Sequence, residues 1–580
     1  MGTILKELGA FKATVISIIV LTFCGVLADL QLPNLLSNII NIGIVNSDSA
    51  YVVRIGLYMV LFAVLSAVAH MINGFLSSKM SSGLGRNLRR KLFVKTESFS
   101  LHEFDRFGTA SLITRTTNDI TQVQGFTMMF MRVALQAPVM AIGGVIMAVS
   151  KNAGLSFVIL GSVTVLAFVV TIVARKALPI STSMQKKLDN VNCVLREKLT
   201  GIRVIRAFNT DEYEKKRFDA ANTDLTKTAL KMQHLMTTMM PMVMFVMNLT
   251  TIFIVAIGSH WVGQGTLLDG DIVAVIQYAM QIMMSLTMLS MILVMLPRAT
   301  ASADRINEVL KTELSIQNPA SPAKESNKKG YVEFCDVSFS FNNAEEAALS
   351  HISFKAGPGE TTAIIGSTGS GKTTLLNLIP RLYDATEGKV LVDGIDVKAY
   401  NQTALRDKIG YIPQKAVLFT GTIADNIRYG DENATQEELT KAASIAQSLN
   451  FIMEKPEKMD THIAQGGTNV SGGQKQRLAI ARAIVKKPEI YLFDDSFSAL
   501  DFKTDAALRA ALKPETKEAT VIIVAQRVST IMDANRILVL DEGAVVGEGT
   551  HRELLESCEV YKEIVSSQLS VEEIAKGGGK

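Results

Sequence analysis

The sequence predicts a multi-domain protein: an all-α domain of six transmembrane helices with long cytoplasmic extensions, followed by an α/β domain. Six long apolar segments lie in the first half of the 580 residues. A polar stretch at 312–330 has the Asn, Pro, Ser and Lys content of a linker. A glycine-rich loop in the second half lies between a strand-like and a helix-like run. We therefore expect a transmembrane domain at 1–311, a second domain at 331–570 and a tail at 571–580.

The six apolar segments are long enough to cross a bilayer. Each holds about 19 or more mostly apolar residues, and ~20 residues of helix span a hydrocarbon core of ~30 Å. Buried helices of a soluble protein are the alternative, which six such lengths in one half-chain disfavour. The segments are 13–40, 52–76, 128–149, 155–173, 240–262 and 272–296.

Charge in the connecting segments predicts the orientation in the membrane. Lys and Arg are frequent after the second and the fourth apolar segment, whereas 43–51 and 263–271 contain neither. Basic connections stay on the cytoplasmic side. Both termini and the second domain are therefore expected in the cytoplasm, beside the cell membrane.

The connections 76–126 and 174–241 are long, polar and helix-like. They predict that the membrane helices continue into the cytoplasm, turn near 110–115 and 208–213, and return. Such turns are suited to press on a cytoplasmic domain. Solvated helical hairpins without a mechanical role are the alternative.

Two features of the apolar segments are candidates for function. Asp29 is a carboxylate within an apolar segment, and such residues often mark functional sites in membranes. Alternatively, it pairs within the helix bundle or lies near the outer interface. Methionines cluster in the fifth and sixth segments, where most are expected to fill packing gaps and a few to line a cavity that accepts apolar shapes.

Charge and cysteine content disfavour other classes of protein. A net charge of +4 is small and argues against a nucleic-acid partner. The four cysteines are far apart and lack metal-ligand spacing, so free thiols are expected. They are Cys24, Cys193, Cys335 and Cys558.

The glycine-rich loop fits the pattern G-x-x-x-x-G-K-[ST], which cradles nucleotide phosphates. A strand-like run at 362–365 precedes it, and a helix-like run beginning at Thr374 follows. Backbone N–H groups at such a helix start form an anion-binding nest. Lys372 would reach the β- and γ-phosphates of ATP, and Thr373 would place its hydroxyl on Mg²⁺. The loop comprises Gly366, Ser367, Thr368, Gly369, Ser370, Gly371, Lys372 and Thr373.

Further motifs follow in a fixed order. Alternating runs at 332–334 and 337–341 read as strands, and Phe341 would either stack on a base or belong to the core. Gln414 ends the run Tyr-Ile-Pro-Gln, and Ser-Gly-Gly-Gln at 471–474 precedes a helix-like run. An apolar strand then ends in Asp494, where a phosphate-loop ATPase holds Mg²⁺.

In this order and spacing the motifs resemble those of an ABC transporter. The resemblance implies that Phe341 stacks on adenine and that Gln414 senses Mg²⁺ and the attacking water. It also implies that the family signature completes the site of the opposite subunit, and that 498–501, ending in Asp501, lies at the dimer seam. The signature residues are Ser471, Gly472, Gly473 and Gln474. The six apolar segments resemble the exporter type, so the resemblance covers nearly the whole chain.

Two positions depart from the family pattern. Asp495 stands where the family has a Glu that orients or deprotonates water, so its carboxylate is one methylene short. Gln526 stands where the family has a His that contacts the γ-phosphate, and an amide cannot carry the imidazolium charge. Displacement of about 1 Å can cost ~10²-fold in rate. We therefore expect this chain's own site to bind ATP and to hydrolyse it poorly, although the retained carboxylate of Asp495 would suffice on the alternative view.

With these two departures, the chain resembles the degenerate subunit of bacterial heterodimeric multidrug exporters. The resemblance implies a partner half-transporter with the usual Glu and His, and a substrate that is an amphipathic drug, a lipid or a peptide. Other classes are an importer, an ATP-gated channel or receptor, and a soluble DNA-repair ATPase. The six apolar segments disfavour the last, and importers usually keep the two domains on separate chains.

Overall fold

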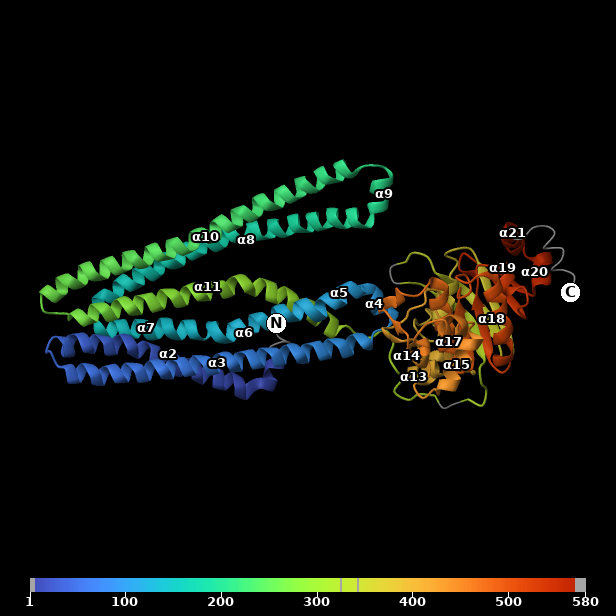
Figure 1. The fold of residues 1–580 in the computed structure, drawn as a ribbon, viewed down its shortest axis with the longest axis horizontal. Helices are drawn as coiled ribbons and strands as arrows, with labels where there is room; N and C mark the ends of the chain where they lie inside the picture. The colour runs from blue at the N-terminus through green and yellow to red at the C-terminus, as the bar shows by residue number, and fades with distance from the viewer. Residues whose placement is uncertain (1–5, 324–325, 342–343, 569–580) are drawn as a thin grey trace. The chain divides into compact units, whose positions relative to one another are not determined.

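A computed structural model describes residues 6–323, 326–341 and 344–568. It forms two compact units, a membrane unit of Met1–Ser98 with Phe107–Glu313 and a nucleotide unit of Phe99–Arg106 with Leu314–Lys580. The predicted tail at 571–580 lies outside the described residues. Figure 1 shows the elements of both units.

The membrane unit is all-α. Six helical stretches are long and apolar enough to cross a membrane, and each contains one of the six predicted segments. The helices of this unit and its boundary are α2 (Lys12–Asn38), η2 (Ile39–Ile44), α3 (Ser49–Glu97), α4 (Leu101–Phe107), α5 (Thr109–Thr114), η3 (Arg115–Asp119), α6 (Ile120–Met129), η4 (Phe130–Ala134), α7 (Gln136–Lys151), α8 (Ala153–Thr200), α9 (Ile202–Ala207), α10 (Asp211–Gly263) and α11 (Asp269–Lys311).

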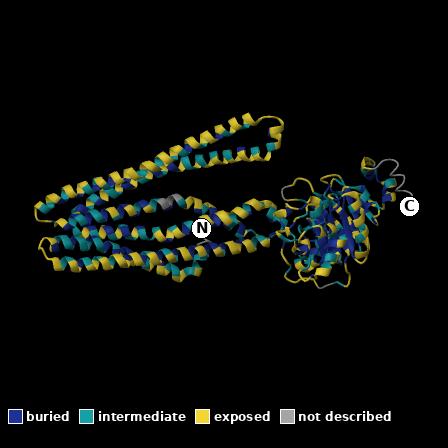
Figure 2. Ribbon diagram, in the orientation of Figure 1, coloured by how far each residue is buried: buried dark blue, intermediate teal, exposed yellow. Residues whose placement is uncertain are grey.

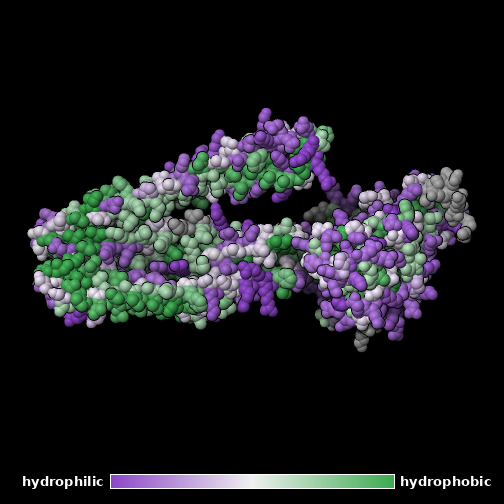
Figure 3. Space-filling model, viewed as in Figure 1, coloured by the Kyte–Doolittle hydropathy of each residue, from purple (hydrophilic) through white to green (hydrophobic). Residues whose placement is uncertain are grey.

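The predicted extensions beyond the membrane are confirmed. Helix α8 has 48 residues and α10 has 53, which at 1.5 Å per residue gives about 70–80 Å, against ~30 Å for a hydrocarbon core. In Figure 1 the α8–α9–α10 hairpin diverges from α11. The space-filling view shows apolar residues gathered over the helix ends far from α9 and polar residues towards it (Figure 3).

The outward faces of these helices are apolar as well as exposed. Leu57, Leu61 and Phe157 are 66%, 61% and 73% exposed, and Figure 2 shows exposed residues along the outer side of the bundle. Apolar side chains on the outside fit lipid as the surrounding solvent. The backbone of each helix satisfies its own hydrogen bonds, as that solvent requires.

Asp29 pairs within the bundle. Its carboxylate accepts a hydrogen bond from Ser66 of α3 and lies 2.9 Å from Nε2 of His70 on the same helix. The side chain is 24% exposed. Of the alternatives for this carboxylate, pairing inside the bundle is the one that the structure supports.

One predicted turn is wrong in position. Residues 110–115 are helical, mostly in α5, and the chain reverses earlier, between Ser98 and Gly108. Gly108 has φ +72°, a left-handed conformation that favours glycine. The other predicted turn, at 208–213, is confirmed because α9 ends at Ala207 and α10 begins at Asp211.

The nucleotide unit is α/β with two main sheets. The larger has the order β12-β11-β3-β10-β9-β6, and all its neighbours are parallel except β12. The smaller is antiparallel, in the order β2-β1-β4-β5. The strands are β1 (Val332–Phe339), β2 (Leu349–Ala356), β3 (Thr361–Gly366), β4 (Glu387–Val392), β5 (Ile395–Asp396), β6 (Ile409–Ile412), β7 (Gly421–Thr422), β8 (His462–Ile463), β9 (Ile490–Asp494), β10 (Thr520–Val524), β11 (Arg536–Asp541) and β12 (Ala544–Gly549).

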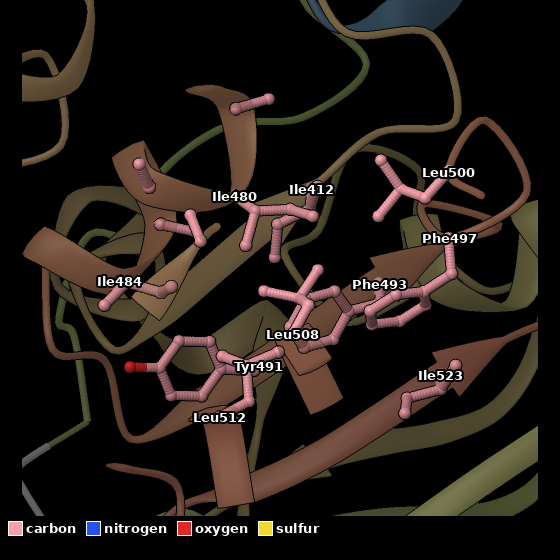
Figure 4. Close-up of a cluster of buried hydrophobic side chains, with 14 of the residues drawn as sticks. Ile412, Ile480, Ile484, Tyr491, Phe493, Phe497, Leu500, Leu508, Leu512 and Ile523 are labelled. Carbon is pink, nitrogen blue, oxygen red and sulfur yellow. The ribbon is translucent and has the colours of Figure 1, made fainter. Parts of the chain in front are cut away.

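Helices cover the central strands on both faces. Along β9, Tyr491 and Phe493 belong to one core cluster, and Ile490 and Leu492 to another. Figure 4 shows the first cluster, in which side chains such as Ile484 meet those of β9. The helices are α12 (Lys372–Leu378), α13 (Gln402–Asp407), α14 (Ile423–Arg428), α15 (Gln436–Ile445), α16 (Leu449–Met453), α17 (Gly472–Val485), α18 (Phe502–Glu515), α19 (Val528–Ile531), α20 (His551–Ser557) and α21 (Glu559–Gln568).

Helix α4 is fastened to the linker by a buried carboxylate. Glu103 is 2% exposed and accepts hydrogen bonds from the backbone and hydroxyl of Ser100, both at 2.7 Å, and from the backbone of Ser315 at 2.9 Å. Burial raises the pKa of Glu103, but these bonds outweigh it and lower the pKa to about 2. The carboxylate therefore stays charged and ties α4 to the start of the linker.

Replacing this carboxylate should release α4. We expect Glu103→Ala to speed amide hydrogen exchange at 100–106 and 314–317, because three donors lose an ionised acceptor, at a cost of about 2–3 kcal/mol. The exposed Glu97→Ala serves as the matched control and should leave exchange there unchanged. Equal protection in both variants would contradict the role given to Glu103.

Candidate nucleotide site

The carboxyl ends of four neighbouring strands meet at one edge of the larger sheet. Val524 of β10 lies opposite Ile364 of β3 on one side and Asp494 of β9 on the other, and Ile412 of β6 lies opposite Phe493. Side chains that follow these strands are therefore brought together, at the edge where open parallel sheets bind ligands. The backbone N–H of Asp495 donates to the carbonyl of Val524 at 2.9 Å, which ties two of the strand ends.

The predicted phosphate loop joins β3 to α12. Gly369 and Gly371 have φ +88° and +93°, which side chains rarely adopt. A Cβ on Gly366 would lie 2.0 Å from the carbonyl oxygen of Leu540. Ser367 and Thr368 are exposed, Ser370 is buried, and Thr374 lies in the first turn of α12. Both the backbone and the packing of this loop therefore require glycine, and its N–H groups lie at a helix start.

Lys372 has its ammonium group within the loop. Its Nζ donates to the carbonyls of Gly366 at 3.0 Å and Ser367 at 2.6 Å, and to Oγ of Ser370 at 3.3 Å. Burial lowers the pKa of Lys372, and the nearby carboxylates of Asp495 and Asp494 oppose that shift. A half-buried ammonium whose hydrogen bonds all go to neutral oxygens suits an anionic ligand, since phosphate would replace these oxygens with charged acceptors.

Thr373 and Asp494 form a pair of oxygen ligands. The Thr373 hydroxyl donates to Oδ1 of Asp494 at 2.9 Å, and the Tyr411 hydroxyl donates to Oδ2 at 3.4 Å. Asp494 is 2% exposed, and burial raises its pKa, with the Asp495 charge adding to the shift. A bound cation would offset that cost, and hard oxygen donors are what Mg²⁺ prefers. The residues present thus fit a magnesium ion.

Asp495 and Gln414 meet beside this pair. Nε2 of Gln414 donates to Oδ2 of Asp495 at 3.3 Å. Asp495 is 7% exposed and has φ +45°, a conformation that Asp tolerates better than most residues. Gln526 follows β10 at the same sheet edge and is exposed. The structure thus brings together the loop, Asp494, Asp495 and Gln414.

Phe341 lies in a group of aromatic side chains. It is 42% exposed and makes edge contacts with Phe339 and Tyr383. A cavity of about 230 Å³ beside Phe341 is also lined by Ser100 and His102 of the α4 segment. An exposed aromatic face at a cavity suits stacking with a planar base.

The Tyr383 hydroxyl donates to Oδ2 of Asp105 in α4 at 2.8 Å. Burial is the main cause that raises the pKa of Tyr383, so the phenol remains a donor. Sequence analysis missed both residues, because neither lies in a recognisable motif and they are 278 positions apart.

The predicted signature lies at the start of α17. Ser471 and Gln474 form a capping box, with Ser471 Oγ accepting from the Gln474 backbone at 3.3 Å and Gln474 Oε1 accepting from the Ser471 backbone at 3.0 Å. Gly472 has open space around its Cβ position, and that of Gly473 would be 3.2 Å from the Ala499 carbonyl. Among the described hydrogen bonds, none joins the signature to the phosphate loop.

Asp501 has a local structural role. It caps α18 by accepting from the Thr504 backbone at 2.9 Å and hydroxyl at 2.7 Å, which lowers the pKa of Asp501. Its exposed position leaves it accessible to another chain.

The membrane unit holds a separate cavity of about 170 Å³ between α7 with η4 and α11. The methionines that line this cavity are Met140, Met284 and Met288. Met283, by contrast, is 1% exposed and packed in the core. Within the sixth segment, Met283 thus fills the core, whereas Met284 and Met288 line the cavity.

Comparisons with known proteins agree with both units. Residues 15–286 match the family model for the ABC transporter transmembrane region, and 349–498 match the ABC transporter model. An uncharacterized ABC transporter ATP-binding protein of Mycobacterium tuberculosis is 40% identical over 97% of both chains. An ATP-dependent lipid A-core flippase of Pseudomonas aeruginosa is 34% identical over 88% of this chain and 84% of its own.

A solved structure has the same architecture. A bacterial Atm1-family ABC exporter with ATP bound has a TM-score of 0.81 and 25% identity, covering 97% of this chain and 99% of its own. The chain therefore belongs to the ABC transporter family, as an exporter-type protein whose second unit is the ATP-binding ATPase.

Proposed function

We propose that the chain is one half of a heterodimeric exporter that moves amphipathic compounds out across the cytoplasmic membrane. The observation that carries this proposal is the pairing of Asp495 and Gln526 at catalytic positions with an intact signature at 471–474. The charge of the connecting segments supports cytoplasmic termini and a cytoplasmic ATPase unit. The domain boundaries proposed are those at 311, 330 and 570.

The site binds ATP through groups with separate tasks. The loop amides and Lys372 hold the β- and γ-phosphates, while Phe341 stacks on the base. Thr373 and Asp494 would hold Mg²⁺, Gln414 would contact it, and the ion would supply positive charge that neutralises the phosphates. Phosphoryl transfer depends on positioning and electrostatics, so it is sensitive to the residue that orients water.

Asp495 is poorly suited to that orienting task. Its carboxylate is one methylene shorter than Glu and already accepts from Gln414. Gln526 offers an amide where a cation would stabilise the γ-phosphate. The site of this chain therefore retains nucleotide and contributes little hydrolysis, and the partner is expected to supply a Glu and a His.

The signature supports a two-chain site. The N-terminus of α17, a 14-residue helix, has exposed Ser471 and Gly472 at its start. Helix N-termini attract phosphate. We assign this helix start to the γ-phosphate of ATP held on the partner, with Asp501 at the seam.

The α8–α9–α10 hairpin offers a second surface to the partner. Val204, Phe208 and Tyr213 near its tip are 60%, 75% and 68% exposed. An apolar cluster of this kind at the end of a polar arm marks an interaction site. We assign it to the partner's cytoplasmic unit, so that closure of the ATPase pair moves the membrane helices.

Substrate chemistry follows from the cavity in the membrane unit. Thioethers at Met140, Met284 and Met288 adapt to many apolar shapes, which supports amphipathic drugs. Export of a lipid is the second candidate, favoured by relatives that are named lipid A-core flippases. Accumulation against a gradient in vesicles separates either activity from that of an ATP-gated channel, which only equilibrates its solute.

The asymmetry can be tested in the assembled transporter. We expect Asp495→Asn to change ATP turnover by less than about twofold. Replacing the partner's catalytic Glu with Gln should abolish turnover, because orientation of water at the partner's site contributes about 10²-fold or more to the rate. Turnover is measured in proteoliposomes at saturating ATP. Equal losses from the two changes would contradict the asymmetry.

The degenerate site should also be repairable. Asp495→Glu with Gln526→His is expected to raise ATP hydrolysis by the purified chain, assembled with copies of itself in lipid, by about ten- to a hundredfold. Asp495→Asn with Gln526→Ala provides the matched control and should remain slow. Brisk hydrolysis by the unmodified chain alone would overturn the proposal.

The signature can be separated from its capping role. Ser471→Ala should lower turnover of the assembled transporter about a hundredfold, because it removes a donor to the partner's ATP. Thr435→Ala is the control, since Thr435 forms the same capping box with Glu438 in α15 and should cost only ~1 kcal/mol of local stability. Similar turnover in the two variants would show that only capping matters.

A further inference from the structure

The cavity between α7 and α11 contains a buried oxygen without a hydrogen-bond partner among the described residues. This oxygen is Oε1 of Gln281 on α11, and Gln281 is one of the residues that line the cavity. A buried acceptor left unsatisfied costs about 1–3 kcal/mol. An acceptor at a cavity wall is therefore a candidate for contact with a ligand.

The orientation of the Gln281 amide is set by its neighbour. Its Nε2 lies 3.5 Å from the backbone carbonyl oxygen of Asp29 on α2. Turning the amide over would place two acceptors against each other, because a carbonyl oxygen cannot donate. The nitrogen therefore faces α2, and the oxygen is the end of the amide left without a partner among the described residues.

A second acceptor lies one turn along the same helix. The Ser285 hydroxyl donates its proton to the carbonyl of Ile282 at 2.8 Å, so its oxygen can only accept from the cavity. Of the lining residues, none is Lys, Arg, His, Asp or Glu. The other polar residue of the lining is Gln136, so the site offers acceptors at Gln281 and Ser285, one further amide, and no charge to an ion.

The size of the cavity limits the group that it can hold. At about 170 Å³ it is close to the ~150 Å³ apolar cavity that binds benzene in another protein. The sulfurs of Met140, Met284 and Met288 are favourable neighbours for an aromatic ring. Met284 and Met288 are 45% and 49% exposed, so the cavity opens at the surface of the chain.

We propose that this cavity is a subsite for one aromatic ring bearing a hydroxyl or amino donor, which Gln281 recognises. The substrates are then amphipathic molecules with a phenol-like or aniline-like end. This inference rests on the proposed exporter function and names a feature of its substrates. A ligand without the donor leaves the Gln281 oxygen unpaired, which is how such a site discriminates.

The test uses 4-fluorophenol, which has the donor, and 4-fluoroanisole, in which a methyl group replaces the hydroxyl proton. Binding to the full chain in lipid nanodiscs, without ATP, is followed by ¹⁹F NMR, and signal from empty nanodiscs is subtracted. The phenol should bind about tenfold more tightly than its methyl ether. Gln281→Leu should remove that preference by weakening phenol binding.

Gln277→Leu is the matched control. It makes the same substitution one turn earlier on α11, at a residue outside the cavity lining, and should keep the preference. Met284→Trp, at a position exposed enough to accept a larger side chain, should fill the cavity and remove binding of both probes. Thermal unfolding of the membrane unit at the temperature of the unmodified chain shows that each variant is folded.

Equal affinity of the unmodified chain for the two probes would overturn the subsite. Phenol binding that survives both Gln281→Leu and Met284→Trp would do the same, since it would place the probe in lipid or elsewhere. Because probe binding is measured without nucleotide, its failure leaves the Asp495 experiments untouched. Failure of those experiments would instead remove the heterodimer and leave the ring subsite standing.

Discussion

The parallel register of β3, β10, β9 and β6 is the constraint on which the nucleotide unit depends. These strands are covered on both faces, so a slip of one residue would exchange Phe493 and Leu492 between two cores. The same register sets the contact of Thr373 with Asp494 and that of Gln414 with Asp495. Packing far from the phosphates thus fixes where the ligands of ATP lie.

The solvent around the membrane unit is lipid rather than water. Lipid demands that backbone groups be satisfied within each helix, and the six long stretches are accordingly helical, with the π-helical segments η2, η3 and η4 among them. Polar side chains within it must find partners: Asp29 has Ser66 and His70, whereas the oxygen of Gln281 has none among the described residues. That contrast separates a carboxylate that supports the bundle from an amide available to a ligand.

Much of this architecture could be predicted from the sequence because its signals are local. Apolar runs indicated the six helices, and the spacing of Gly366, Gly371 and Lys372 indicated a phosphate loop with its helix. The predicted position of the first of the two turns was wrong, because the chain reverses between Ser98 and Gly108, ahead of the polar residues that indicated a turn. The pairs Tyr383 with Asp105 and Glu103 with Ser315 could not be predicted, since each joins residues more than 200 positions apart.

Asp495 and Gln526, which depart from the family pattern, can also be recognised from the sequence alone. Their effect on the site cannot. Asp495 keeps the charge of its position and loses reach, and only the contact with Gln414 shows what the shorter side chain does. At Asp495 the residue type alone therefore says little about the chemical role. Among the described hydrogen bonds, none joins the start of α17 to the phosphate loop of the same chain, and this is why the proposed role of the signature involves a second chain.

Membership of Phe99–Arg106 in the nucleotide unit has a mechanical consequence. The chain crosses between the two units at three places, after Ser98, after Arg106 and after Glu313. A unit joined to another by one chain segment can rotate freely. Three joining segments restrict its independent movements. A displacement of the ATPase unit therefore acts on the chain at all three of these crossings.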